Sequence, residues 1–168
     1  MRRVVVTGMG MVTPVGRDME TTWKALLAGK SGVGPITLFD ARTFPTRIAA
    51  EVPDFRLGDY LDDSAGRWVE HSRNSRFALA AATMAVKDSG LLEAKPEINR
   101  RRFGIYLGSG EGQHDFPRFV SLLARCTKDG RVDTADFTRL GARELHPVRE
   151  AEQEPGTPSG HLASYFGA

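Results

Sequence analysis

The sequence predicts an α/β protein in which short buried strands alternate with helices through glycine-rich turns. Residues 4–7 form a β-branched run that ends at Gly8 and Gly10, as expected of a core strand that enters a tight turn. A helical pattern follows. The same order returns at residues 103–107, where an apolar run leads into a glycine-rich turn at 108–112 and a second helical pattern. Because this alternation is typical of layered sheets covered by helices, we predict one layered α/β domain.

The composition fits a single globular domain and excludes several classes of partner. Hydrophobic residues make up 40% and charged residues 26% of the 168 residues, and the net charge is +2. So small a charge argues against a nucleic-acid or membrane partner. Cys126 is the single cysteine, which excludes an internal disulfide and a cysteine-based metal cluster and favours the cytoplasm. The apolar run at residues 4–6 is too short for a signal peptide or a membrane span.

The first helix is expected to begin at Asp18, because an aspartate side chain can accept hydrogen bonds from the free N–H groups of a first turn. An apolar face follows with helical spacing, and Gly29 provides the stop. Residues 31–63 are rich in glycine, proline and aspartate. We therefore expect irregular loops there, with one small strand near residues 46–52.

The strongest helical periodicity runs over residues 67–88 and ends at Ser89 and Gly90. Its C-terminal half is apolar nearly all round and contains many small residues, which let another backbone approach closely. This pattern suits a helix buried inside a layered protein or its dimer. A further helix is expected at residues 116–124.

The segment between Cys126 and Pro158 is predicted to be a solvated connection. Its composition is polar and acidic, with glutamates at positions 150, 152 and 154 directly before a stretch that contains Pro and Gly. Such a composition is typical of segments that lack a packed core. Regular structure is expected to resume at Ser159.

The opening glycines could also belong to a dinucleotide-binding loop, in which backbone N–H groups bind a pyrophosphate at a helix N-terminus. The residues disfavour that function. A third glycine in register is missing, Pro14 removes a donor, and Asp18 places a negative charge where the phosphate would lie. Close packing at a tight turn is the better interpretation of Gly8 and Gly10. A nucleotide-binding oxidoreductase fragment is therefore the least favoured hypothesis.

Four ordered segments resemble the beta-ketoacyl-acyl-carrier-protein synthases, the condensing enzymes of fatty-acid and polyketide synthesis. They are residues 2–33, which open with RRVVVTGMGMVTPVG, 75–91 (SRFALAAATMAVKDSGL), 101–112 (RRFGIYLGSGEG) and 158–168 (PSGHLASYFGA). The resemblance implies that residues 1–168 form the N-terminal domain of a synthase with a thiolase-like αβαβα layered fold. It also implies acyltransferase activity by decarboxylative condensation, a homodimer or heterodimer, and an acyl-carrier protein as partner. We expect no cofactor and no metal.

The condensation needs a thiolate nucleophile, two imidazoles and oxyanion donors. By resemblance, the nucleophile segment would lie just beyond residue 168, so the chain is expected to be truncated before it. Cys126 lies in LLARCTKDG, without a following glycine turn or a helix N-terminus to activate the thiol. We expect a structural thiol there, not a nucleophile.

The four histidines are not assigned to catalysis. The Gly-His-Leu context of His161 is similar to that of a catalytic histidine of the family, but its neighbours match an earlier, noncatalytic segment. His71, His114 and His146 match no catalytic motif, and each is expected to be solvated or locally bonded. The set of predicted catalytic residues is therefore empty.

Two departures from the family pattern bear on substrate and partner. Elongating members usually carry an apolar gate of the acyl channel after the glycine-serine-glycine turn, and Glu111 stands there in this chain. A carboxylate beside an alkyl chain is costly unless it is hydrated, hydrogen-bonded or protonated, so Glu111 is either a substrate-binding gate residue or a surface residue. Many members also carry a basic patch for the carrier protein, of which only Arg67 remains. The run at Arg100–Arg102 could replace it or simply be solvated.

We therefore interpret the chain as the front part of a synthase that contributes scaffold, dimer contacts and part of the acyl pocket and is inactive alone. The alternative is a noncatalytic synthase-like subunit that pairs with a complete synthase through its apolar helix.

Overall fold

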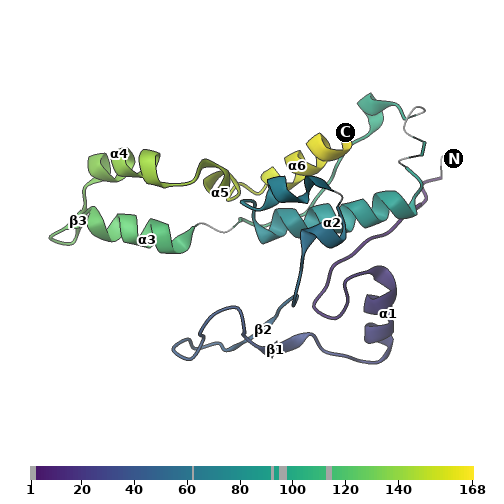
Figure 1. Ribbon diagram of the computed structural model, residues 1–168, viewed down its shortest axis with the longest axis horizontal. Coiled ribbons are helices and arrows are strands. Elements are labelled where there is room, and N and C mark those ends of the chain that lie inside the picture. The colour runs from purple at the N-terminus through teal and green to yellow at the C-terminus, as the bar shows by residue number, and fades with distance from the viewer. Residues whose placement is uncertain (1–2, 62, 92, 95–97, 113–114) are drawn as a thin grey trace. The chain divides into compact units, whose positions relative to one another are not determined.

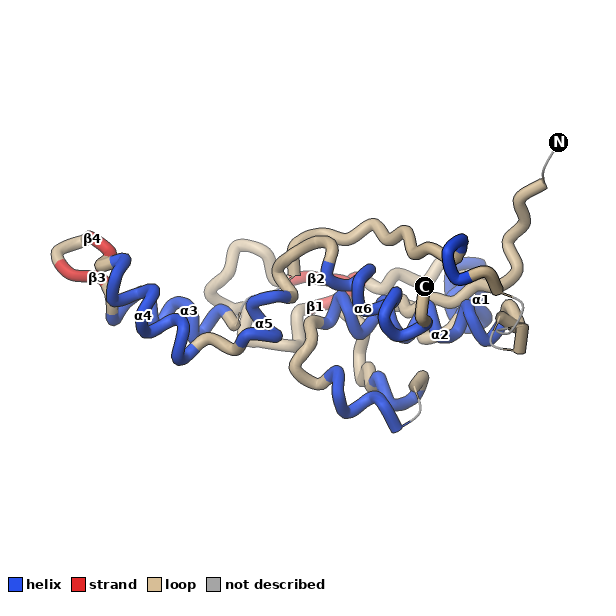
Figure 2. Tube along the Cα trace, turned by 90° about the horizontal axis from the view of Figure 1, so that it is seen from above, coloured by secondary structure: helices blue, strands red, loops and turns tan. Residues whose placement is uncertain are grey.

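A computed structural model describes residues 3–61, 63–91, 93–94, 98–112 and 115–168. The chain divides into two compact units: unit 1 comprises Met1–Gly66 and Phe77–Asn99, and unit 2 comprises Arg67–Arg76 and Arg100–Ala168. Helices, short strands and long loops make up the described residues (Figure 2). None of the helices in the described part of the chain has the length and hydropathy that a membrane crossing requires.

Unit 1 begins its regular structure with helix α1, Met19–Leu27, as the sequence predicts (Figure 1). The Asp18 carboxylate accepts a hydrogen bond from the Thr21 backbone N–H at 2.7 Å, which satisfies one of the free donors of the first turn. Gly29 ends the helix with a φ of +64°, a backbone conformation that glycine adopts without strain. The expected start and stop of this helix are therefore confirmed.

A small antiparallel pair follows in the expected loop region. Strands β1, Val33–Pro35, and β2, Ile48–Ala50, pair with Gly34 opposite Ala49. Thr37 follows β1, and its hydroxyl donates a hydrogen bond at 2.6 Å to the carboxylate of Glu51, which follows β2. This bond joins the two segments beyond the strand pair. A 3₁₀ turn, η1, then spans Leu57–Asp59. The prediction of loops with one small strand near residues 46–52 is confirmed, with β1 as its partner.

Helix α2 spans Arg73–Asp88 and starts later than the predicted residue 67, because a 3₁₀ helix, η2, occupies Asp63–Trp68. The expected stop is correct, since Gly90 follows with a φ of +65°. Leu79 and Ala80, in the apolar half of α2, are fully buried. The described part of unit 1 thus has its most buried residues on this helix.

The segment that contains Gly8 and Gly10 packs directly on α2. A Cβ atom on Gly10 would lie 2.7 Å from the backbone nitrogen of Ala85 and would also meet the carbonyl oxygen of Ala81. The Met9 N–H between the two glycines donates to the Asp88 carboxylate at 2.9 Å. This confirms that the glycines serve close packing, whereas the tight turn predicted at Gly8 and Gly10 is wrong, because residues 3–12 form no turn.

The strands predicted at residues 4–7 and 103–107 are wrong for this structure. Both segments belong to no strand, and neither pairs with another described residue in a sheet. Val4 is 97% exposed and Tyr106 is 99% exposed. A β-branched run favours an extended backbone, but it becomes a core strand only when neighbouring strands supply hydrogen-bond partners and cover its faces. The described residues provide no such neighbours for these two segments.

Unit 2 contains a helical hairpin followed by two more helices. Helix α3 and helix α4 lie side by side and are joined by a tight strand hairpin (Figure 1). The elements are α3, Phe116–Arg125; β3, Thr127–Lys128; β4, Arg131–Val132; α4, Thr134–Glu144; α5, Pro147–Ala151; and α6, Thr157–Phe166. A 3₁₀ turn, η4, spans Arg100–Arg102. Leu122 of α3 is fully buried, and the Arg125 guanidinium makes two 2.7 Å bonds to the Glu144 carboxylate.

The prediction of a solvated connection between Cys126 and Pro158 is therefore wrong. Local capping signals outweigh the polar composition in this segment. The Asp133 side chain accepts from the Asp136 N–H at 3.0 Å and caps α4, and a proline lies in the first turn of both α5 and α6. Proline is favoured there because it has no N–H to leave unpaired.

We predict that Gly10→Ala destabilises the chain by about 1–3 kcal/mol, because the added methyl group has no room against α2. Urea unfolding followed by circular dichroism measures the loss. Gly34→Ala is the matched control, since a Cβ at Gly34 would meet no atom within 4 Å. Equal losses in the two variants would show that close packing at Gly10 is not the cause.

Candidate functional site

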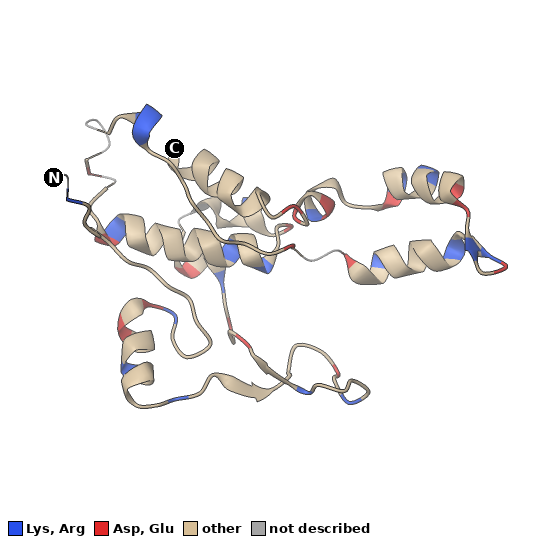
Figure 3. Ribbon diagram, turned by 180° about the vertical axis from the view of Figure 1, so that it is seen from behind, with Lys and Arg blue, Asp and Glu red and all other residues tan. Residues whose placement is uncertain are grey.

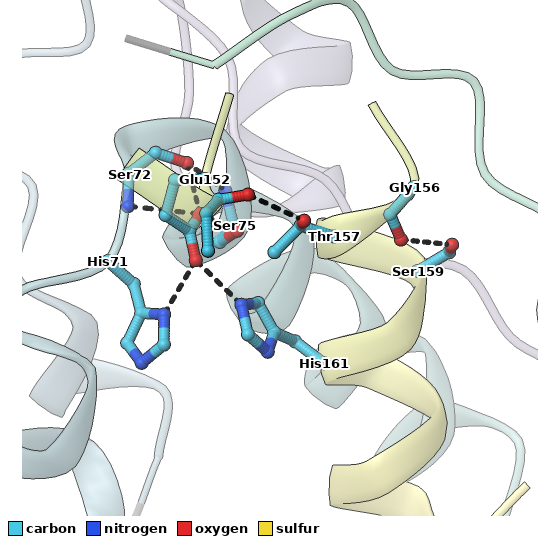
Figure 4. A network of polar contacts seen from close by, with 9 residues as sticks. His71, Ser72, Ser75, Glu152, Gly156, Thr157, Ser159 and His161 are labelled. Atoms are coloured by element: carbon cyan, nitrogen blue, oxygen red, sulfur yellow. Dashed lines mark hydrogen bonds and ion pairs between the residues drawn. The ribbon is translucent and has the colours of Figure 1, made fainter. Parts of the chain in front are cut away.

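The carboxylate of Glu152 is the centre of a polar cluster within unit 2. Its side chain is 1% exposed. One oxygen, Oε1, lies 2.6 Å from both His71 Nδ1 and His161 Nε2. The other oxygen, Oε2, accepts from the Ser72 hydroxyl at 2.7 Å, the Ser72 N–H at 3.2 Å and the Ser75 hydroxyl at 2.5 Å. Figure 4 shows the two imidazoles pointing at the same carboxylate oxygen. We call these five residues the Glu152 cluster.

Three separate segments bring the cluster together. Ser72 directly precedes α2 and caps it, because its hydroxyl accepts from the Ser75 N–H at 3.2 Å. The Glu152 carboxylate sits against this same helix start, where the positive end of the helix dipole favours an anion. Glu152 itself follows α5, and His161 lies on α6. The cluster therefore links the start of α2 to the end of α5 and to α6.

The carboxyl group of Glu152 is ionised. Burial by itself would raise the pKa of Glu152, but the hydrogen bonds from Ser75, His71, Ser72 and His161 outweigh burial and lower the pKa from 4.5 to about 2. Donors of this kind stabilise the anion more than the neutral acid. The site thus holds a buried negative charge at neutral pH.

An aromatic wall covers the histidines. The Trp68 ring is 5% exposed, and its centroid lies 4.8 Å from that of His71 and 5.2 Å from that of His161. The two imidazole centroids are 4.5 Å apart in an edge-on arrangement. The Arg67 guanidinium lies 4.9 Å from the centre of the Trp68 ring and 5.4 Å from that of Tyr165, within cation–π distance. Arg67 therefore makes these two ring contacts within unit 2.

A polar pocket of about 350 Å³ opens beside the cluster and reaches His71 and Glu152. Its wall carries an ion-pair network in which Arg149 donates to Glu70 at 2.8 Å and to Asp115 at 2.6 Å. The bond from Arg149 lowers the pKa of Asp115 below its usual value. So charged a lining suits water or an ion better than an alkyl chain.

A second pocket, of about 490 Å³, belongs to unit 1 and has the opposite character. Apolar side chains of the N-terminal segment and α1 line it, among them Met9, Met11, Met19, Trp23 and Leu26. Trp23 and Leu26 are more than half exposed. The polar side chains among the described lining residues of this apolar pocket are Glu20 and Thr22.

The residues singled out in the sequence occupy different positions. Glu111 is exposed, one residue before Gly112, whose N–H donates to the Gln153 carbonyl at 3.3 Å. Cys126 is 1% exposed at the end of α3. His146 precedes α5, and His114 lies outside the described residues.

Sequence reasoning missed Glu152 and the pairing of His71 with His161. The two histidines are ninety residues apart, and the family-like context of His161 does not indicate a contact with His71 or Glu152. The acidic composition around Glu152 predicts a solvated residue, whereas Glu152 is buried. The prolines that begin α5 and α6 could have revealed the two helices, but no local signal distinguishes Glu152 from Glu150 or Glu154.

The Arg100–Arg102 run forms a basic patch on the short 3₁₀ turn η4 (Figure 3). Arg100 is engaged in the fold, because its guanidinium donates to the Phe166 carbonyl at 3.0 Å and to the Gly167 carbonyl. A cation at these carbonyls stabilises the C-terminal end of α6. One of the three arginines is therefore committed to the structure of unit 2.

Comparison with known proteins identifies a family over the whole chain. The model of the beta-ketoacyl synthase N-terminal domain matches residues 1–168. The chain is 50% identical over 111 residues to 3-oxoacyl-[acyl-carrier-protein] synthase 2 of Coxiella burnetii, which covers 66% of this chain and 26% of that relative. This chain therefore spans about a quarter of the length of that curated relative.

Solved structures give the same fold. A beta-ketoacyl synthase from Burkholderia phymatum superposes with a TM-score of 0.68 and 25% identity, covering 99% of this chain and 37% of that one. A type II polyketide ketosynthase in complex with its acyl-carrier protein superposes with a TM-score of 0.65 over 97% of this chain and 39% of that one; at 22% identity it shows likeness of fold alone. The predicted fold class, α/β of the thiolase-like layered type, is confirmed by these superpositions.

We predict that Glu152→Ala lowers the free energy of unfolding by roughly 3 kcal/mol, because it leaves several buried donors without an acceptor and opens a cavity. Chemical denaturation measures the change. Glu154→Ala is the matched control, since it removes an exposed carboxylate two residues away. A loss at Glu152 no larger than that at Glu154 would contradict a central role for the buried carboxylate.

The stabilising effect of the Glu152 carboxylate should depend on pH in the acid range. The folded-state pKa of about 2 lies below the ordinary value of 4.5, so the contribution is complete above about pH 5 and is lost as the pH falls toward 2. The difference in unfolding free energy between the wild type and Glu152→Gln should therefore shrink over this range. A difference that stays constant from pH 5 to pH 2.5 would mean that the carboxyl group titrates normally.

Proposed function

This chain belongs to the beta-ketoacyl synthase family, and we propose that it forms the N-terminal domain of a 3-oxoacyl-acyl-carrier-protein synthase. Such an enzyme joins an acyl thioester to a malonyl unit with loss of CO₂. The observation that carries the proposal is the family match over residues 1–168, together with 50% identity over 111 residues to a synthase of that name. Fatty-acid or polyketide synthesis is the pathway class that this chemistry serves.

The described residues support a scaffolding role for this domain. A condensing nucleophile must be an accessible thiolate, activated by a neighbouring base or a helix N-terminus. Cys126 is buried and lies at the C-terminal end of α3, so its thiol is not accessible to an acyl carrier. His71 and His161 both bind Glu152 and are therefore held in place by the fold. In this proposal, the acyl-carrying cysteine and its two histidines come from outside these residues.

The remaining parts of the proposal concern assembly and location. We infer a homodimer or heterodimer with a synthase, an acyl-carrier protein as the partner that delivers substrate, and a cytoplasmic location. The single buried cysteine suits a reducing compartment. The exposed Arg102 of η4 offers positive charge to an acidic carrier, with electrostatic attraction as the physical basis.

A noncatalytic partner subunit is the second candidate. Two observations favour it: Arg67, the residue left of the expected carrier patch, stacks on Trp68, and a carboxylate at Glu111 replaces an apolar gate. Both would weaken a synthase that must dock a carrier and hold an acyl chain. Stable co-purification with a complete synthase, together with no condensation by this protein's own assembly, would favour this alternative.

We predict that the purified chain forms no stoichiometric acyl-enzyme. Incubation with a radiolabelled acyl-carrier protein, followed by denaturing electrophoresis, should leave the chain unlabelled because Cys126 is buried and not activated. Cys126→Ser should behave identically. Labelling near one equivalent that disappears in Cys126→Ser would identify this thiol as a nucleophile and overturn the assignment.

Glu111 is proposed as a gate residue of the acyl channel. It is exposed in this structure, so its carboxylate is hydrated, and an alkyl chain that displaced this water would meet an energetic cost. In the complete synthase, Glu111→Met should raise kcat/KM for long-chain acyl carriers by about fivefold or more relative to short-chain ones. Glu154→Met is the control. Equal changes for both chain lengths would place Glu111 on the surface.

A further inference from the structure

We propose that His71, Glu152 and His161 form a binding site for a divalent transition-metal ion, with Zn²⁺ as the best-matched ion. Each residue offers one ligand atom, and the three atoms lie within 4.8 Å of one another. They come from three segments of unit 2, so an ion would join the start of α2 to α6 and to the end of α5. This inference goes beyond the proposed synthase function and does not depend on it.

The donor types match the ion. Two imidazole nitrogens and one carboxylate oxygen suit Zn²⁺ and related transition metals, whereas Mg²⁺ and Ca²⁺ prefer all-oxygen sites. Zn²⁺ with two histidines and one glutamate leaves a fourth position for water, an arrangement known from open zinc sites. The chain's cysteine is not needed, because Cys126 lies outside this set.

Binding of the ion requires the three ligand groups to rearrange. Zinc bonds of about 2.0–2.2 Å in a tetrahedron place ligand atoms about 3.3 Å apart. Glu152 Oε1 now lies 2.6 Å from each imidazole nitrogen, and the three ligand atoms lie within 4.8 Å of one another. To admit the ion, Oε1 must move away from the nitrogens by about 0.7 Å, and the two nitrogens must approach each other until they are about 3.3 Å apart. The two nitrogens then present their lone pairs, and each neutral imidazole carries its proton on the other ring nitrogen.

The groups behind the ligands are already in place. The hydroxyls of Ser72 and Ser75 donate to Glu152 Oε2 at 2.7 and 2.5 Å, which leaves Oε1 for the metal. Trp68 covers both imidazoles and fixes their planes. Such outer contacts orient metal ligands and strengthen binding.

Charge also favours an ion at this position. In the part of the chain that the structure describes, the hydrogen bonds and ion pairs of the Glu152 carboxylate involve hydroxyls, one backbone N–H and two imidazoles, with no Lys or Arg. A buried anion held by such groups gains from a full positive charge. The imidazoles are reachable, since the side chains of His71 and His161 are 16% and 24% exposed, and the polar pocket reaches His71 and Glu152.

The test is metal binding by the tag-free 168-residue chain after treatment with a chelator. Titration with Zn²⁺ in competition with a chromophoric chelator should show one equivalent bound, and Co²⁺ should give the intense visible bands of a four-coordinate site. His161→Gln and Glu152→Gln should each weaken Zn²⁺ binding at least 100-fold. His146→Gln, which removes a histidine outside the cluster, should bind like the wild type.

Two further measurements test metal binding even if these variants fail to fold. Ser75→Ala keeps all three ligands and should weaken Zn²⁺ binding about tenfold through its effect on Glu152, and the wild-type Co²⁺ spectrum needs no variant. Absence of stoichiometric binding by the folded wild type would overturn the proposal. So would equal affinity in the wild type and a folded His161→Gln variant.

Discussion

A buried carboxylate loses its hydrogen bonds to water and must replace them with hydrogen bonds from the protein. The donors to Glu152 belong to two other segments, the start of α2 and helix α6. Its two oxygens receive contacts from His71, Ser72, Ser75 and His161 at 2.5 to 3.2 Å. Withdrawal of any one segment would leave a buried charge partly unsatisfied, which is expensive in a low-dielectric interior. The requirement therefore fixes the start of α2, the end of α5 and the orientation of α6 together.

This constraint also decides which residues are free for chemistry. Both histidines of the cluster are bound to Glu152. The Arg67 guanidinium packs on the Trp68 ring, and the Arg100 guanidinium donates to a carbonyl group at the C-terminal end of α6. Glu111 and Arg102 are exposed in the described part of unit 2. A domain arranged in this way is suited to the scaffolding role proposed above.

The sequence was a good guide wherever the determinant was local. Asp18 and Gly29 mark the ends of α1, Gly90 follows α2, and residues 116–124 lie within α3, because capping and periodicity act over a few residues. The runs at 4–7 and 103–107 predict strands that the structure does not contain, because a strand depends on partners that no local pattern reveals. The resemblance to the synthase family predicts the fold class, which these local elements alone do not.

Glu152 is the clearest case that local sequence does not predict, because its environment is created by residues up to 81 positions away. The most direct measurement is a double-mutant cycle on the free energy of unfolding with Glu152→Gln, His161→Gln and the double variant, in the presence of a chelator. The two sites should be coupled by about 1.5 kcal/mol or more, since each group supports the other. Additive effects within error would show that the carboxylate does not hold α6 in place.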